Sequence, residues 1–431
     1  MMRPLYTLAV IGAQPFLRRK LRRRGVAEPG YLQHVDERFG HYHGSAEPGA
    51  LWVHAVSLGE TRTAAILIDR LRRMKTDVRI LLTHSTATGR AEGERLLREG
   101  DLQAWLPWDT PKAVRGFLNH FSPCAGVMIE TEVWPNIVAA CKAREIPLML
   151  ANARFSERSL TQARRLSRLA RPAYGALTAV WAQTEGDAHR LAEAGATVKG
   201  VFGNLKFDAA PDADQLALGR RWRESLARPV VMFASSREGE EAEFFRIVQA
   251  SREIERAGWA RRDSDRMARG VQWLVAPRHP QRFDEVVALA QSHGLSVSRR
   301  TEWNGEPAAA DIWIGDSLGE MPLYYGLADA ALLGSSFENL GGQNLIEAAA
   351  CGCPVVMGPH TFNFADAAEL AEHAGAALRV QSMEEGIRCA VMLAADPSRH
   401  DAAARSALAF SAAHQGAADK TAAAVLALVA R

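Results

Sequence analysis

Short apolar runs alternate with helical patterns along most of the chain, and this alternation restricts the possible folds more than any other feature. In the first half, predicted strands begin near residue 51 and recur at residues 78–83, 103–106, 124–129, 147–153 and 179–183. In the second half they recur at residues 229–234, 272–276, 311–315, 330–333 and 354–357. Repeated strand–helix units of this kind indicate parallel sheets covered by helices on both faces. We find no repeat with the period of roughly 20–50 residues that is typical of solenoid proteins.

A polar segment between the two series of strands indicates the domain organisation. Residues 209–228 contain Pro211 near their start and no clear strand, so we predict a linker there. The predicted domains are residues 25–208 and residues 229–431, and the second ends in alanine-rich helices from residue 400. The predicted fold class is α/β, with two doubly wound, Rossmann-like domains facing a central cleft. Because 48% of the 431 residues are hydrophobic, the chain can fill the cores of two such domains.

The first 24 residues form a separate segment in which apolar residues precede basic ones. Residues 5–16 are apolar apart from Gln14 and Pro15, and the run is too short to span a bilayer easily. The basic residues that follow are Arg18, Arg19, Lys20, Arg22, Arg23 and Arg24. A secretory signal peptide has the opposite order. This order suits insertion into one leaflet with the cations on anionic headgroups, so we predict that residues 1–24 associate with a membrane surface. The alternative is a basic amphipathic helix that covers the first domain.

Charge and cysteine content argue against two functional classes. The net charge of +3 is close to balance, and aromatic residues do not alternate with basic ones along any predicted strand, so we expect no nucleic-acid partner. The five cysteines make no Cys-x-x-Cys pair and no zinc spacing, and most lie in apolar runs, as core residues of a protein in a reducing cytoplasm do. They are Cys124, Cys141, Cys351, Cys353 and Cys389.

Metal-dependent and serine-hydrolase chemistry also fit the sequence poorly. The Asp-x-Asp pairs worth considering are Asp212 with Asp214 and Asp263 with Asp265. Neither pair follows an apolar strand, where a cation-bridging pair of a nucleotide-sugar enzyme is expected. No serine lies in a Gly-x-Ser-x-Gly turn. We therefore predict neither a metal nor another cofactor.

Glu60 is the candidate general base. It follows a predicted buried strand, after the break Ser57-Leu58-Gly59, and helical spacing continues over residues 61–74. A carboxylate at such a turn lies at the carboxyl edge of a parallel sheet, where open α/β folds bind ligands. We expect the nearby helix N-terminus to keep Glu60 ionised, as a general base must be. The alternative is a first-turn glutamate that only complements the helix dipole.

Glu130 and Lys206 occupy equivalent positions at predicted strand ends in the first half. A carboxylate can stabilise positive charge that develops on a sugar ring, and an ammonium group can offset the charge of a departing phosphate. The alternatives for these two residues are a purely structural ion pair or solvated strand ends.

The second half carries a Gly341-Gly342 turn between a predicted strand and a predicted helix. Two glycines let the backbone approach a ligand closely, and the helix start offers N–H donors to a phosphate. Glu347, one turn inside that helix, can accept hydrogen bonds from a ribose. The pattern favours nucleotide-sugar binding, with a structural turn as the alternative. Two further strand-end loops, Pro277-Arg278-His279-Pro280 and Gly315-Asp316-Ser317-Leu318-Gly319-Glu320, would face the same site, and Arg278 could neutralise a phosphate.

Taken together, these motifs resemble the family of bacterial 3-deoxy-D-manno-octulosonic acid (Kdo) transferases over nearly the whole chain. The segments that carry the resemblance are Asp36-Glu37-Arg38-Phe39-Gly40, Ser57-Leu58-Gly59-Glu60, Glu130-Thr131-Glu132-Val133-Trp134-Pro135, Ala151-Asn152-Ala153-Arg154, Gly203-Asn204-Leu205-Lys206-Phe207, Pro277-Arg278-His279-Pro280, Gly341-Gly342-Gln343-Asn344-Leu345-Ile346-Glu347 and Gly358-Pro359-His360-Thr361-Phe362-Asn363-Phe364. Gln343 departs from the family pattern, which usually has histidine at this position, so its role is open.

The resemblance implies a GT-B glycosyltransferase that transfers Kdo from CMP-Kdo to lipid IVA, the lipid A precursor, in lipopolysaccharide biosynthesis. It implies inversion at the anomeric centre without a metal, and a location at the cytoplasmic face of the inner membrane, peripheral or anchored by the N-terminus. It gives Glu60 as the proton acceptor and Glu130 and Lys206 as transition-state stabilisers. The implied CMP-binding residues are Pro277, Arg278, Leu318, Gly319, Glu320, Asn344, Leu345, Ile346 and Glu347.

Two other readings of the sequence remain open. The chain could be another GT-B enzyme, such as a lipid-linked N-acetylglucosamine transferase or an epimerase. It could also be a non-catalytic protein that binds a nucleotide at a membrane surface. The sequence does not indicate the number of Kdo residues transferred or the oligomeric state.

Overall fold

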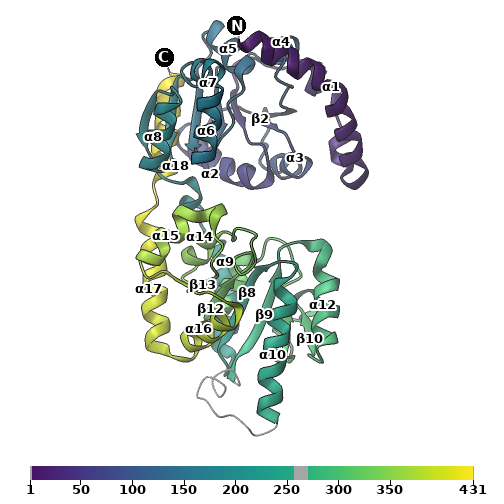
Figure 1. The fold of residues 1–431 in the computed structure, drawn as a ribbon, viewed down its shortest axis with the longest axis vertical. Coiled ribbons are helices and arrows are strands. Elements are labelled where there is room, and N and C mark those ends of the chain that lie inside the picture. The colour runs from purple at the N-terminus through teal and green to yellow at the C-terminus, as the bar shows by residue number, and fades with distance from the viewer. Residues whose placement is uncertain (1, 257–269, 431) are drawn as a thin grey trace. The chain divides into compact units, whose positions relative to one another are not determined.

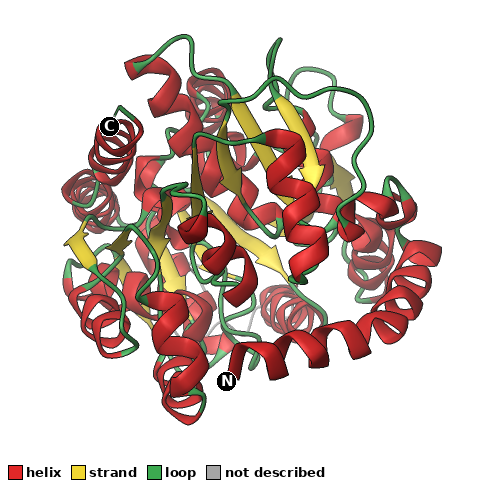
Figure 2. Ribbon diagram, turned by 90° about the horizontal axis from the view of Figure 1, so that it is seen from above, coloured by secondary structure: helices red, strands yellow, loops and turns green. Residues whose placement is uncertain are grey.

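The chain folds into two compact units, each built on its own sheet. The computed structural model describes residues 2–256 and 270–430. The first unit comprises Met1–Asp208 together with Gln415–Arg431, and the second comprises Ala209–His414 (Figure 1). Helices lie around the strands of the sheets in the view of Figure 2, as repeated strand–helix units require.

The first unit contains a seven-stranded parallel sheet in the order β3-β2-β1-β4-β5-β6-β7. Its strands are β1 (Leu51–His54), β2 (Ile80–His84), β3 (Leu102–Trp105), β4 (Ala125–Ile129), β5 (Leu148–Ala153), β6 (Ala179–Ala182) and β7 (Val198–Val201). Its helices are α1 (Met2–Ala27), α2 (Leu58–Met74), α3 (Ala87–Glu94), α4 (Pro111–Phe121), α5 (Pro135–Ala143), α6 (Glu157–Arg165), α7 (Ser167–Tyr174), α8 (Glu185–Glu193) and α18 (Ala417–Val429). Short 3₁₀ helices are η1 (Pro29–Leu32), η2 (Val35–Phe39) and η3 (Leu205–Asp208).

Two hydrophobic cores cover the two faces of this sheet, because side chains alternate between the faces along each strand. Trp52 of β1 packs in one core with Phe117 of α4. Its neighbours Leu51 and Val53 lie in the other core with Leu67 of α2. Every residue of β1 is buried, which explains why the strand appears in the sequence as a continuous apolar run.

The C-terminal helix α18 belongs to the first unit, not to the second domain as the sequence suggested. It packs against α2, and Arg70 Nε lies 3.4 Å from Asp419 Oδ1 between the two helices. The carboxylate of Asp208 accepts hydrogen bonds from the N–H groups of Gly416 at 2.5 Å and Ala418 at 2.8 Å, and so satisfies the start of α18. An alanine-rich pattern predicts a helix but does not specify which sheet it covers.

The second unit contains another seven-stranded parallel sheet, in the order β10-β11-β9-β8-β12-β13-β14. Its strands are β8 (Val230–Ser236), β9 (Gln272–Pro277), β10 (Val297–Arg299), β11 (Ile312–Ile314), β12 (Ala330–Leu333), β13 (Val355–Met357) and β14 (Ala377–Arg379). Its helices are α9 (Ala213–Ser225), α10 (Glu240–Arg256), α12 (Phe283–Ser292), α13 (Met321–Leu327), α14 (Leu345–Ala350), α15 (Ala365–His373), α16 (Met383–Ala395) and α17 (Pro397–Ala413), with 3₁₀ helices η5 (Pro280–Arg282), η6 (Arg300–Glu302) and η7 (Phe362–Phe364).

Helix α9 occupies most of the segment that the sequence suggested was a linker. It packs closely on α13, because glycines at the contact let the backbones approach. A Cβ atom added at Gly219 would lie only 2.1 Å from the carbonyl oxygen of Leu323. Residues 213–225 are therefore an integral part of the second unit.

Helix α1 is a single helix of 26 residues on the outer side of the first unit (Figures 1 and 2). Thr7 and Asn136 share side-chain hydrogen bonds at 3.0 and 3.2 Å, and the guanidinium group of Arg18 lies 3.7 Å from the ring centre of Phe39. Gly25 is the one buried residue among those of α1 that the structure describes. Among the described residues, no helix combines the length and the apolar character needed to cross a bilayer.

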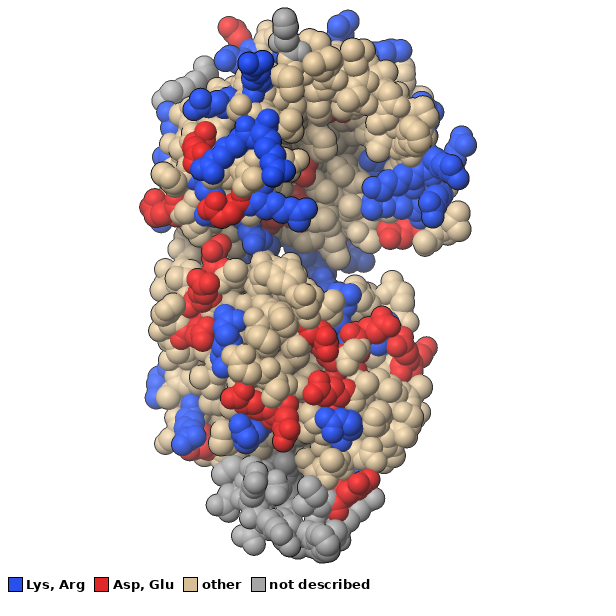
Figure 3. Space-filling view, viewed as in Figure 1, with Lys and Arg blue, Asp and Glu red and all other residues tan. Residues whose placement is uncertain are grey.

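The outer surface of α1 is apolar near its start and basic near its end. The exposed large apolar side chains are Leu5, Leu8, Ile11 and Phe16. The predicted basic cluster is exposed on the second half of the helix, where Lys and Arg side chains gather at the right of the first unit in Figure 3. Helix α1 thus contacts the first unit, as a covering helix would, and also exposes the apolar-then-basic surface expected of a membrane-associating segment.

Candidate active site

The topology of the first sheet places Glu60 and Glu130 at neighbouring strand ends. Strand β1 lies between β2 and β4, and the chain continues to one side of β1 through β2 before returning to its other side at β4. Ligands of open α/β sheets bind outside the carboxyl ends of the strands at such a switch point. Glu60 follows β1 and Glu130 follows β4. The position of both carboxylates is therefore that of a ligand site.

Hydrogen bonds at the start of α2 fix the carboxylate of Glu60. Ser57 is the N-cap residue, and its Oγ accepts a hydrogen bond from the Glu60 N–H at 3.4 Å. The Val56 N–H donates to Glu60 Oε2 at 2.9 Å, and the Ser57 hydroxyl donates to Oε1 at 3.2 Å. Glu60 therefore completes a capping arrangement, and its side chain is held in one orientation at the strand end.

The pKa of Glu60 is raised to about 7, chiefly because the half-buried carboxyl group is partly removed from water. The hydrogen bond from Val56 opposes this shift, and the negative charges of Glu130 and Glu132 reinforce it. The helix N-terminus was expected to keep Glu60 ionised, but removal from water has the larger effect and moves the pKa toward neutrality. A carboxyl group with a pKa near neutrality is well suited to exchange protons at physiological pH.

Glu130 and Lys206 form an ion pair, with Lys206 Nζ 3.2 Å from Glu130 Oε1. The side chains are 19% and 26% exposed, so the pair can be reached from solvent. Glu130 has a left-handed backbone conformation with φ of 67°, which is uncommon for a residue other than glycine and is often found at functional sites. Lys206 lies in η3, where Asn152 Oδ1 accepts a hydrogen bond from the neighbouring Leu205 N–H at 3.0 Å. The two residues thus form the ion pair that was one of the alternatives predicted from the sequence.

Glu132 is a further acidic residue near Glu60, and no role was predicted for it from the sequence. Burial raises the pKa of its carboxyl group, and the indole group of Trp134 opposes the rise. Its charge in turn raises the pKa of Glu60. Its place in the Glu130–Pro135 segment, two residues after a predicted site residue, was the signal available in the sequence.

The loop after β12 in the second unit has the close-approach geometry expected of its two glycines. Gly341 and Gly342 have φ values of 90° and 75°, which favour glycine. The Gly342 N–H donates to the carbonyl of Ser335 at 2.7 Å, and Gln343 Nε2 donates to Ser335 Oγ at 2.9 Å. Gln343 therefore ties the glycine turn to the end of β12. This contact gives the departure from the family pattern a structural role.

The predicted nucleotide-binding residues lie at the carboxyl ends of neighbouring strands in the second sheet. The strands β11, β9, β8 and β12 are consecutive in that sheet, with the switch point between β8 and β12. Pro277 is the last residue of β9 and Arg278 follows it, residues 318–320 follow β11, and the glycine turn follows β12. Asn344 caps α14 by accepting a hydrogen bond from the Ile346 N–H at 3.2 Å. Leu345 and Ile346 are buried in α14, and Glu347 is half-buried there.

The polarity of these residues suits a nucleotide. Arg278 is exposed, and its N–H donates to the carbonyl of Ser236 at 3.0 Å, which joins the β8 and β9 loops. Glu320 Oε1 lies 2.8 Å from Arg300 Nη2. Leu318 is 74% exposed, next to Gly319 with its left-handed backbone. The loops thus offer a cation, a paired carboxylate and an apolar side chain at one edge of the sheet.

Glu240, which the sequence analysis did not single out, holds the start of the β12 loop. It lies at the start of α10 and is 1% exposed. Its carboxylate accepts hydrogen bonds from the N–H groups of Ser335 at 2.7 Å and Phe337 at 3.1 Å. A glutamate in the first helical turn after a strand was the signal in the sequence, but such residues are common and only the fold shows the bonds.

The Asp-x-Asp pair that the structure describes, Asp212 with Asp214, gives no metal site. Asp212 Oδ1 accepts a hydrogen bond from the Gln215 N–H at 3.0 Å and caps α9, while Asp263 and Asp265 lie outside the described residues. Over residues 2–256 and 270–430, no group of three or more His, Cys, Asp and Glu side chains could hold a metal ion.

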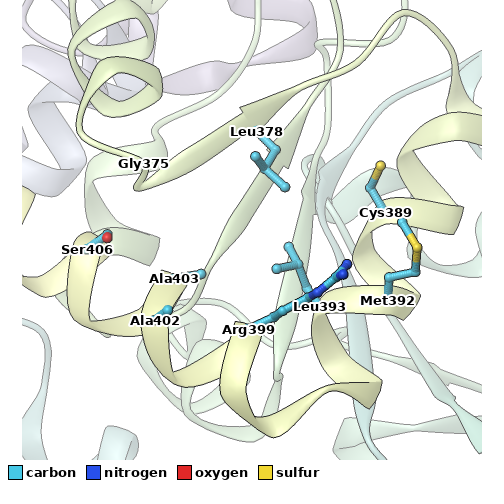
Figure 4. A pocket seen from close by; sticks show the side chains of 9 residues that line it. All are labelled: Gly375, Leu378, Cys389, Met392, Leu393, Arg399, Ala402, Ala403 and Ser406. Carbon is cyan, nitrogen blue, oxygen red and sulfur yellow. The ribbon is translucent and has the colours of Figure 1, made fainter.

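A cavity of about 340 Å³ in the second unit contains none of the predicted site residues (Figure 4). Leu378 of β14 and Cys389 and Met392 of α16 face it, and residues of α17 close its other side. We assign this cavity no role.

Comparison with known proteins identifies the family. Residues 33–209 match the family model described as 3-deoxy-D-manno-octulosonic-acid transferase (kdotransferase). A 3-deoxy-D-manno-octulosonic acid transferase of Bordetella pertussis is 46% identical over 430 residues, which cover 97% of each chain. The chain belongs to the Kdo transferase family. Another member, from Haemophilus influenzae, is 29% identical over 91% of this chain and 90% of its own length. The protein is therefore a glycosyltransferase.

Solved structures show that this Kdo transferase family member has the GT-B fold. UDP-GlcNAc 2-epimerase from Neisseria meningitidis, bound to UDP-GlcNAc, matches 88% of this chain and 99% of its own with a TM-score of 0.56 at 14% identity. MurG of Acinetobacter baumannii matches the same shares with a TM-score of 0.53, also at 14% identity. The predicted α/β class with two doubly wound domains is confirmed.

Proposed function

We propose that this protein is an inverting glycosyltransferase that transfers Kdo from CMP-Kdo to lipid IVA, the lipid A precursor of lipopolysaccharide biosynthesis. The name shared by its curated relatives supports the transferred sugar. The observation that carries the mechanism is Glu60, whose carboxylate is fixed at the switch point of the first unit and has a pKa of about 7. Such a group can take a proton from a sugar hydroxyl at neutral pH.

In the proposed reaction, Glu60 removes the proton of the acceptor hydroxyl while that oxygen attacks the anomeric carbon of Kdo. The bond from this carbon to the phosphate oxygen breaks, and CMP leaves with the bonding electrons. Attack from the side opposite to CMP inverts the anomeric centre. Glu130 stabilises positive charge on the sugar ring, and Lys206 offsets negative charge on the phosphate. Both side chains are partly exposed, so a substrate can reach them.

The loops of the second unit form the proposed CMP site. Arg278 neutralises phosphate charge, and Glu347 accepts hydrogen bonds from the ribose. Leu318 offers an exposed apolar side chain to the base. The remaining proposed contacts are made by Pro277, Gly319, Glu320, Asn344, Leu345 and Ile346.

We place the reaction at the cytoplasmic face of the inner membrane, to which α1 attaches peripherally. The exposed apolar side chains at the start of α1 suit the interface of a leaflet, and the following cations suit anionic headgroups. An acylated acceptor would be met at such a surface.

Mass spectrometry of the product made by purified protein from CMP-Kdo and lipid IVA tests the reaction directly. We expect lipid IVA to gain the mass of Kdo, and the number of additions gives the count of transferred residues. A product built from a UDP-linked sugar would support the alternative GT-B activity. No turnover with any donor would support a nucleotide-binding protein without catalysis.

The substitution Glu60→Gln tests the base. Glutamine keeps oxygen and nitrogen near the helix start but cannot take the proton, so we expect kcat to fall by about 10²–10⁴-fold while CMP affinity is retained. The measurements are initial rates and CMP binding by calorimetry.

Glu385→Gln provides a matched control, because Glu385 makes the same capping contacts at the start of α16. The Gln381 N–H donates to Glu385 Oε2 at 2.9 Å, and Ser382 Oγ accepts from the Glu385 N–H at 3.2 Å. We expect this variant to keep its activity. Near-normal transfer by Glu60→Gln, or an equal loss in both variants, would remove Glu60 from the base role.

A further inference from the structure

A cavity lies between α1 and the rest of the first unit, and its volume of about 400 Å³ is within the range of small-molecule sites. One stripe of α1 lines it, formed by Tyr6, Val10, Ala13, Leu17 and Leu21. These residues follow the three- and four-residue spacing that places side chains on one helix face. They are only half-buried, although they face the body of the unit. The helix therefore rests over a hollow instead of closing onto the core.

The opposite wall of the cavity is also largely apolar. It is formed by the segment Leu106-Pro107-Trp108, which follows β3, together with Trp134 at the start of α5. Most of the lining surface on both walls is thus carbon. A hydrocarbon chain between these walls would lose contact with water along both of them, and each buried methylene group adds about fourfold to affinity.

One end of this cavity is polar and adjoins Glu60. Val56 and Ser85 line the cavity, and the Ser85 N–H donates to the Val56 carbonyl at 3.2 Å. The Val56 N–H in turn donates to Glu60 Oε2 at 2.9 Å. Val56 therefore lines the cavity and also contacts the proposed base Glu60.

Arg38 places a buried positive charge at the same end. It is 4% exposed, and its Nη2 donates to the Ser85 carbonyl at 3.3 Å. Its Nε has no hydrogen-bond partner among the residues that the structure describes. Lys20 and Arg24 of α1 add positive charge to the lining. Asp109 and Glu132 also line the cavity, so its three cationic side chains outnumber two carboxyl groups. An anionic group bound to a hydrocarbon chain would complement this excess of positive charge beside apolar surface.

We propose that this cavity holds one acyl chain of the acceptor, so that α1 positions the lipid substrate as well as meeting the membrane. The phosphorylated sugar end lies at Arg38 and Glu60, and the chain extends beneath α1 along the stripe. This inference rests on the proposed function, because it assumes a phosphorylated, acylated sugar as the acceptor. It differs from simple insertion of α1 into a leaflet, where the outer face of the helix would contact lipid.

Filling the cavity with Ala13→Trp tests the proposal, with Ala9→Trp as the matched control. Ala13 lines the cavity, whereas Ala9 lies one turn away on the exposed face of α1. We expect Ala13→Trp to raise the KM for lipid IVA about tenfold or more, and Ala9→Trp to leave it within about twofold. Both variants should retain CMP affinity, and neither should change transfer to a fully deacylated acceptor. An equal KM in the two variants would overturn the proposal.

The wild-type protein provides a second measurement that does not depend on how either variant folds. Lipid IVA with a photoreactive diazirine near the end of one acyl chain is bound, irradiated and digested. We expect the label on residues 106–108. A label confined to the outer-face residues Leu5, Leu8 and Phe16 would place the chain in the membrane and overturn the proposal.

These experiments distinguish failure of the proposed function from failure of the proposed acyl site. If the wild-type protein transfers no Kdo to lipid IVA, the proposed function fails whatever the label shows. If transfer occurs but cavity filling has no effect and residues 106–108 are not labelled, the proposed function stands and the acyl site is wrong.

Discussion

At the scale of single residues, Glu60 shows how a structural contact and a chemical role can share one side chain. Its hydrogen bonds to Val56 and Ser57 are capping contacts, which favour the ionised carboxylate. Burial and the charges of Glu130 and Glu132 favour the protonated form and have the larger combined effect. The capping contacts also fix the orientation of the carboxylate. A glutamate that caps the helix and a glutamate that acts as the base therefore have the same arrangement here.

The raised pKa predicts a pH dependence for the proposed reaction. The base must be deprotonated, so activity is present above its pKa and is lost as the pH falls through it. With a pKa of about 7, we expect kcat/KM for the acceptor to fall about tenfold for each pH unit below neutrality. Initial rates between pH 5.5 and 8.5 measure this, with CMP affinity at each pH as the control. A flat profile would contradict the role of Glu60.

The sequence placed Glu60 and Glu130 at strand ends because buried strands form apolar runs, whereas no apolar run marked the strand before Lys206. Glu60, Glu130 and Lys206 do follow β1, β4 and β7. The sequence could not give the pKa of Glu60, because burial depends on side chains that are distant in the chain. For the same reason it did not reveal the contacts of Glu240 with the β12 loop.

At the scale of elements, central strands were easier to predict than edge strands. Fully buried strands such as β1 and β12 form continuous apolar runs. The edge strands β10 and β14 have three residues each and are only partly buried, so neither has a clear apolar run or a long alternating pattern. Both were missed. Helix α9 was missed because its segment is mostly polar, and only Gly219 and Trp222 are buried.

The contact between α9 and α13 gives a prediction about stability. We expect Gly219→Ala to lower the free energy of unfolding by about 1–3 kcal/mol, since the added methyl group would collide with the backbone of α13. Gly12→Ala is the matched helical control, because no atom lies within 4 Å of its added Cβ. That control should raise stability by up to about 1 kcal/mol. Thermal and denaturant unfolding measure both changes, and an equal response would mean that α9 does not pack as described.

At the scale of the whole molecule, α1 gives the protein a surface suited to a membrane. Arg19, Arg22 and Arg23 are exposed on it. Each cation near an anionic membrane contributes about 1 kcal/mol, so we expect replacing all three by alanine to weaken vesicle binding on the order of 100-fold at low salt. Sedimentation with phosphatidylglycerol vesicles measures this.

The control for that experiment replaces three exposed arginines of the second unit. They are Arg221, Arg388 and Arg405. We expect this variant to bind vesicles nearly as well as the wild type. Its binding should weaken as salt is added, because salt screens the attraction to anionic headgroups. If both triple variants lose binding equally, general charge and not α1 directs the protein to the membrane.

Because α18 packs in the first unit, it determines which fragment of the chain could fold as that unit alone. A fragment that stops at residue 208 would leave part of α2 uncovered and would expose apolar surface from the core that α18 completes. Asp208 binds the backbone of Gly416 and Ala418, so the severed ends lie side by side. A fragment meant to fold as the first unit alone should therefore join residues 415–431 to residue 208 through a few glycines. The second unit, residues 209–414, can then be left out without removing α18 from α2.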